Sequence, residues 1–113
     1  MAFVSIDREG DFSLQVMRKT GIVIAYFWAP WCEPCKTIGK EIAAAANHFT
    51  DQVRVLQINV DALQPIAKKY DIVAVPTLLF FQGGKPVKRI IGAISEGEIV
   101  KLLTSLLADT VQA

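Results

Sequence analysis

The sequence feature that most constrains the fold is a seven-residue apolar run that leads directly into a pair of cysteines. The run, Ile22–Trp28, is uncharged and rich in β-branched and aromatic residues. Such a run is typical of a strand buried on both faces in a parallel sheet. Pro30 follows it, and from about Glu33 apolar residues recur at three- and four-residue steps, which predicts a helix. Cys32 and Cys35 are therefore expected where a buried strand feeds a helix.

This position favours a reactive thiolate at Cys32. The first turn of a helix presents unpaired N–H groups and the positive end of the helix dipole, and both stabilise a thiolate. We predict that Cys32 is the nucleophile. Cys35 lies one turn later on the same face, where the two side chains can be bridged, and it is the predicted resolving thiol. Pro34 suits this turn because its missing N–H would have had no helical partner.

Two other interpretations of the cysteine pair are a zinc half-site and a structural bridge. Zinc normally takes four ligands, and the chain offers two thiols and one distant imidazole, His48, so no metal is expected within one subunit. A metal shared between two chains stays open. A disulfide that closes so short a loop would stabilise the fold little, which argues against a purely structural bridge.

The residues around the cysteines resemble the active-site signature of the thioredoxin family. The matching stretch is Phe27-Trp28-Ala29-x-Trp31-Cys32-x-Pro34-Cys35-Lys36. The resemblance continues at the family's spacings through Asn59-Val60-Asp61, Tyr70, Val75-Pro76-Thr77, Gly84 and Gly92. It covers nearly the whole chain without an obvious insertion. It implies thiol–disulfide exchange and the thioredoxin fold.

Length and composition limit the domain organisation and the partners. A chain of 113 residues, 52% hydrophobic, is right for one compact domain over residues 1–113. Twelve basic and 11 acidic residues leave a net charge of +1, which favours neither nucleic acid nor an anionic membrane as a partner. No segment reaches the roughly 18 apolar residues of a membrane span. Two cysteines do not make a disulfide scaffold and the start resembles no secretory signal, so we expect a reducing cytoplasm. The expected oligomeric state is a monomer.

The first half of the chain predicts alternating strands and helices. Residues 3–6 form an expected strand, and residues 9–19 an amphipathic helix with Phe12, Leu14, Val16 and Met17 on its apolar side. The helix after the cysteines is expected to run to about His48, and residues 53–60 to form the next strand. Two strands joined by a helix in this way are parallel, with a right-handed connection.

The second half predicts a change of architecture. A short helix over 63–70 is followed by strands over 77–81 and 86–91, joined by a glycine-containing turn and therefore antiparallel. Ser95 and Glu98 form a capping-box pattern that opens a closing helix. We predict an α/β protein with the thioredoxin fold, the element order βαβαββα, and a central mixed sheet flanked by helices on both faces.

The resemblance also implies a substrate groove. In the family, the proline matching Pro76 is cis, lies against the cysteines, and lets the residue before it, here Val75, pair through its backbone with an extended substrate. The other expected groove residues are Trp31, Pro34, Ala74, Gly92 and Ala93. The partners implied are disulfide-containing proteins and a thioredoxin reductase, with no bound cofactor. The alternatives are a scaffold module with dispensable thiols, or a disulfide oxidase or isomerase.

Three residues depart from the family's pattern and, together with Pro34, are the expected redox-tuning positions. Glu33 stands where the commonest motif has glycine, and its negative charge is expected to make the protein slightly more reducing. Tyr26 and Gln57 replace a buried acid and a lysine, and the acid is credited with accepting a proton from the second cysteine. Because both charges are absent together, neither is left uncompensated in an apolar interior. Cys35 should then lack an internal carboxylate base, so that water or Glu33 takes its proton.

Overall fold

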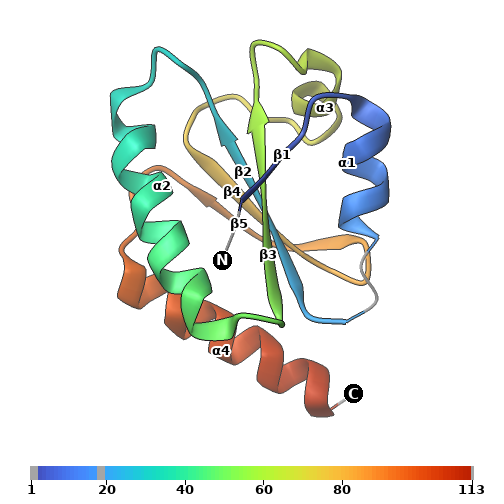
Figure 1. The fold of residues 1–113 in the computed structure, drawn as a ribbon, viewed down its shortest axis with the longest axis vertical. Coiled ribbons are helices and arrows are strands. Elements are labelled where there is room, and N and C mark those ends of the chain that lie inside the picture. Colours follow the sequence, from blue (N-terminus) through green and yellow to red (C-terminus); the bar gives the residue numbers. More distant parts are fainter. Residues whose placement is uncertain (1–2, 18–19, 113) are drawn as a thin grey trace.

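The apolar strands of the sequence form a five-stranded sheet with helices on both faces, as Figure 1 shows. The computed structural model describes residues 3–17 and 20–112. The elements in chain order are β1 (Phe3–Ser5), α1 (Glu9–Val16), β2 (Ile22–Trp28), α2 (Glu33–Ala46), a short 3₁₀ helix η1 (Asn47–Phe49), β3 (Val53–Asn59), α3 (Gln64–Lys69), β4 (Thr77–Gln82), β5 (Lys85–Ile91) and α4 (Glu96–Gln112).

The sheet is mixed, as predicted, and its strand order is β1-β3-β2-β4-β5. β1, β3 and β2 run parallel, while β4 is antiparallel to β2 and β5 antiparallel to β4. The predicted order βαβαββα describes the elements from β2 to α4. The strand and helix expected at the start of the chain are also present, and β1 and α1 form one further βα unit in front of that order.

The central strand β2 is buried on both faces, which confirms the interpretation of the apolar run. Its alternate side chains face different helices. Ile22, Ile24 and Tyr26 belong to the core cluster built with α2 and α4, whereas Val23, Ala25 and Phe27 belong to the cluster built with α1 and α3. A strand with this burial has no solvent face. Packing on both faces therefore fixes the position of its carboxyl end, from which the chain continues to the cysteines.

The prediction for the first helix is partly wrong. α1 ends at Val16, and the part of the prediction that covers residues 18 and 19 lies outside the described residues. Phe12 and Val16, four residues apart, are buried as expected, but Leu14 is 77% exposed and Met17 is 65% exposed. Leu14 follows Phe12 by two residues and so lies on nearly the opposite side of the helix, where it cannot share the buried face.

Gly21, which the sequence predicts to end the first helix, instead lies directly before β2, since the C-cap of α1 is Met17. Gly21 has φ +78°, and a Cβ there would lie 2.3 Å from the Gln52 carbonyl oxygen, so the backbone at this position requires glycine. The hairpin between β4 and β5 turns through two residues with positive φ, both glycine. At the start of α4, the Glu98 N–H donates to Ser95 Oγ (3.2 Å) and the Ser95 N–H donates to Glu98 Oε1 (3.3 Å), which is the predicted capping box. Within the described ranges no helix combines the length and apolar character needed to cross a membrane.

Candidate active site

The two cysteines lie at the junction of β2 and α2 and are joined by a disulfide. Cys32 is the N-cap of α2, with extended backbone angles, and Cys35 lies in the first turn, so that their Cα atoms are 5.4 Å apart. The Cys35 N–H donates to Cys32 Sγ at 3.2 Å. Pro34 occupies the first turn of α2, as the sequence predicts. The helix N-terminus therefore directs an N–H group at the sulfur of Cys32.

The negative charge of Glu33 is compensated by a lysine on the same helix. Lys36 Nζ lies 3.3 Å from Glu33 Oε1, three residues along α2. Both side chains are largely exposed. Because solvent screens such a pair and Lys36 balances the carboxylate, the influence of Glu33 on the sulfur of Cys32 is expected to be small.

The loop that leads into β4 meets the loop that follows β5 at the end of the sheet where β2 leads toward the cysteines, since Thr77 pairs with both Phe27 and Ile91. The Val75–Pro76 peptide bond is cis, as the resemblance implies. The Gly92 N–H donates to the Pro76 carbonyl oxygen at 3.0 Å, which joins the two loops. Val75 packs against the core cluster that contains Cys32 and Cys35, whereas Ala74 and Ala93, next to these loops, are exposed. The structure thus brings the predicted groove residues to one end of the sheet.

Trp31 is the large aromatic at this end and is 68% exposed. Its indole Nε1–H donates to Asp61 Oδ2 at 3.0 Å. Asp61 is itself held in a turn, because its N–H donates to Asn59 Oδ1 at 2.9 Å. From the sequence, Asp61 was only one of the residues that match the thioredoxin family, and no function was predicted for its side chain. The structure shows that it orients the exposed tryptophan beside the disulfide.

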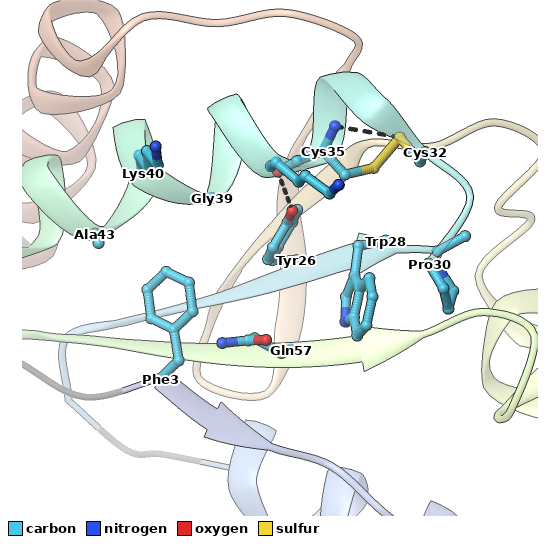
Figure 2. A pocket seen from close by; sticks show the side chains of 12 residues that line it. Phe3, Tyr26, Trp28, Pro30, Cys32, Cys35, Gly39, Lys40, Ala43 and Gln57 are labelled. Atoms are coloured by element: carbon cyan, nitrogen blue, oxygen red, sulfur yellow. Dashed lines mark hydrogen bonds between the residues drawn. A yellow bond between two sulfur atoms is a disulfide. The ribbon is translucent and has the colours of Figure 1, made fainter.

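A pocket of about 350 Å³ opens behind the disulfide, between α2 and the strands β2 and β3, as Figure 2 shows. Tyr26 and Gln57 both line it, and they face each other in the register of β2 and β3. The Tyr26 hydroxyl donates to the main-chain carbonyl oxygen of Cys35. Burial raises the pKa of the Tyr26 hydroxyl to about 12. The described residues that line this pocket include no carboxylate.

Four further residues at this pocket, Phe3, Gly39, Lys40 and Ala43, were not anticipated from the sequence. Phe3 packs edge-on against the ring of Tyr26, with centroids 6.3 Å apart. Lys40 and Gly39 come from the second turn of α2. Of these, Gly39 carries a signal that the sequence does show: a glycine inside an otherwise favourable helix, four residues after Cys35, usually has a packing reason.

A disulfide that closes one turn at the N-terminus of a helix, at the same end of a mixed sheet as a cis-proline loop, is typical of the class of thiol–disulfide oxidoreductases. The sequence model of the family described as thioredoxin matches residues 3–105. The chain belongs to the thioredoxin family and is a thiol–disulfide oxidoreductase that reduces protein disulfides.

Individual relatives agree with this assignment. Thioredoxin 1 of Synechococcus elongatus is 30% identical over 103 residues, which is 91% of this chain and 96% of that protein. The bifunctional thioredoxin reductase/thioredoxin of Mycobacterium leprae is 32% identical over 101 residues, which is 89% of this chain but only 22% of that protein. The crystal structure of Malassezia sympodialis thioredoxin superposes with a TM-score of 0.77 at 28% identity, covering 96% of this chain and 90% of that one.

Proposed function

We propose that Cys32 is the attacking thiolate and Cys35 the resolving thiol in the reduction of protein disulfides. The Cys32 thiolate attacks one sulfur of the partner's disulfide, and the partner's other sulfur leaves with the electron pair. Cys35 then attacks Cys32 Sγ, the Cys32–Cys35 bond forms, and the partner departs with both of its sulfurs reduced. The observation that carries this assignment is the hydrogen bond from the Cys35 N–H to Cys32 Sγ, which would stabilise a thiolate at Cys32.

The substrate is proposed to bind over the joined loops beside the disulfide. Val75 would pair with an extended substrate segment through its main chain, a mode that requires little of the substrate's side chains. The exposed Trp31, Ala74 and Ala93 would form the surrounding surface together with Gly92. Support for this groove comes from the contact between the two loops and from the packing of Val75 against the cysteine-containing cluster.

Regeneration of the oxidised protein requires an external two-electron donor, since the reaction leaves the disulfide closed. A thioredoxin reductase is the proposed donor, and the name of the relative from Mycobacterium leprae, which joins a reductase to a thioredoxin, supports this choice. The proposed setting is the reducing cytoplasm, where a monomeric protein would carry electrons to many disulfides and so contribute to redox homeostasis.

Reduction of insulin disulfides by dithiothreitol tests the assignment of the two cysteines. The wild type is expected to accelerate the reaction and Cys32→Ser to abolish the acceleration. With insulin alone, in the absence of dithiothreitol, reduced Cys35→Ser is expected to accumulate a mixed disulfide at Cys32. Equal activity in the wild type and in Cys32→Ser would instead indicate a scaffold with dispensable thiols. Measurement of the reduction potential distinguishes a disulfide reductase from a disulfide oxidase or isomerase, because a strongly oxidising value would indicate an oxidase or isomerase.

The base for Cys35 is proposed to be water in the pocket behind the disulfide. No carboxylate lines the described part of that pocket, so resolution of the mixed disulfide should accelerate with pH as the Cys35 thiol, with an ordinary pKa of about 8.5, ionises. Single-turnover kinetics across pH measure this step. The double variant Tyr26→Asp with Gln57→Lys should speed the step near neutral pH. A wild-type profile governed by one group well below the thiol's range would show that another base acts.

A further inference from the structure

A tyrosine from the central strand is tied to the helical turn that carries Cys35. The Tyr26 side chain rises from β2 toward α2, and its hydroxyl donates to the Cys35 main-chain carbonyl oxygen, as Figure 2 shows. Tyr26 is 5% exposed and its ring packs edge-on against Phe3. β2 is hydrogen-bonded on one side to β3 and on the other to β4. The hydroxyl is therefore presented to the helix from a buried position on a strand that is paired along both of its edges.

The helix provides room for this contact at Gly39. In an α-helix the N–H of residue 39 donates to the carbonyl of residue 35, and a carbonyl oxygen has a second lone pair that can accept the Tyr26 hydroxyl as well. A Cβ on residue 39 would lie 3.4 Å from the Tyr26 hydroxyl oxygen, which is ordinary contact. A side chain larger than alanine would compete with the phenol ring for the same space.

The hydrogen bond from Tyr26 to Cys35 matters most when the disulfide is open. In the mixed disulfide no covalent bond joins Cys35 to Cys32, and the first turn of a helix is held by few hydrogen bonds of its own. The resolving sulfur must nevertheless be kept close to Cys32 Sγ and in line with the bond that breaks. Orientation of this kind strongly influences the rate of an intramolecular attack. A hydrogen bond from β2 to residue 35 restrains the turn from which that attack is made.

We infer that Tyr26 is a positioning residue for the resolving step, in which its hydroxyl holds the Cys35 turn against the sheet while Cys35 attacks. The inference rests on the proposed roles of the two cysteines. In this step the Cys35 thiol loses its proton to water, its thiolate attacks Cys32 Sγ, and the Cys32–Cys35 bond forms. The bond between Cys32 and the partner's sulfur breaks, and the partner leaves as a thiolate that takes up a proton from water.

Tyr26→Phe tests the inference, because it removes the hydroxyl and keeps the ring. Tyr70→Phe is the matched control, since the Tyr70 ring packs against Phe12 and Phe81 in the cluster built with α1 and α3, on the other face of the sheet. Attack by Cys32 is timed in a Cys35→Ser background, where the mixed disulfide with a disulfide-containing peptide accumulates. Resolution is timed by release of the reduced peptide from proteins that keep Cys35, at peptide concentrations high enough that attack by Cys32 is faster than release. Circular dichroism checks the fold of each variant.

Tyr26→Phe is expected to slow resolution about threefold to tenfold, the effect of losing one hydrogen bond. The rate of attack and the pH at which resolution accelerates should stay as in the wild type, and Tyr70→Phe should change neither step. Gly39→Leu, which keeps the hydroxyl but crowds the ring, should also slow resolution selectively. The inference is overturned if both variants resolve at the wild-type rate or slow both steps alike. Failure of the proposed function looks different, because no mixed disulfide would then form in the Cys35→Ser protein.

Discussion

The ionisation of Tyr26 should make the stability of the oxidised protein fall at alkaline pH. Burial raises the pKa of the Tyr26 hydroxyl from 10.0 to about 12 in the folded protein, whereas the unfolded chain keeps the ordinary value. Between these two values the folded state binds a proton that the unfolded state has released. Folding stability is therefore at its full value below about pH 10 and decreases as the pH rises toward about 12.

The size of this loss follows from the difference between the two pKa values. Since one pKa unit corresponds to about 1.4 kcal/mol, the wild type should lose about 1 kcal/mol of unfolding free energy by pH 11 and about 2 kcal/mol by pH 12. Tyr26→Phe removes the ionising group. At pH 8 the variant should be less stable than the wild type by about 0.5–1.5 kcal/mol, the typical net contribution of one hydrogen bond. The two stabilities should then converge as the pH rises, and the order should reverse by about pH 11, where the loss in the wild type equals the deficit of the variant.

Urea unfolding of the oxidised proteins at a series of pH values measures this difference. The disulfide form is the right one because its cysteines do not titrate, and groups common to both proteins cancel in the comparison. Absorbance titration of the phenolate in the wild type and in Tyr26→Phe reports the ionisation directly. A wild-type-minus-variant difference that stays constant from pH 8 to pH 12 would refute the reasoning.

Three further predictions concern α2 and Trp31. Glu33→Gly should raise the reduction potential by no more than about 20 mV, because an exposed charge pair is worth about 0.2–1 kcal/mol. Equilibration with glutathione at low salt measures the shift. An unchanged or lower potential would contradict the expected role of the charge. Gly39→Ala should stabilise the protein by about 0.4–1 kcal/mol in urea unfolding, since the added Cβ makes ordinary contact with Tyr26, and a loss of stability would show that the helix is tighter there. Asp61→Ala should lower the rate of insulin reduction about twofold to fivefold by releasing the Trp31 indole, with no change in reduction potential, whereas Asp61→Asn, which keeps an acceptor oxygen, should retain most of the rate.

The sequence alone was sufficient for the local elements. The buried strand β2, the helix that starts at the cysteines, the glycine turn of the hairpin and the Ser95/Glu98 capping box are all encoded by neighbouring residues, through hydrophobic periodicity and through side chains that complete nearby backbone hydrogen bonds. The same local logic failed for α1, because hydrophobicity by itself does not say which side of a helix meets the core, and Leu14 faces solvent.

Only the tertiary structure decided how the site is assembled around the disulfide. The Trp31–Asp61 hydrogen bond joins residues 30 positions apart, and the bond from Tyr26 to Cys35 depends on how α2 lies across β2. The meeting of Pro76 with Gly92 likewise depends on the pairing of β4 with β5. The family resemblance implied the groove but contained nothing about a tyrosine that binds the Cys35 carbonyl. Such contacts are set by strand register and by the packing of helices on the sheet, and neither is a property of any short stretch of chain.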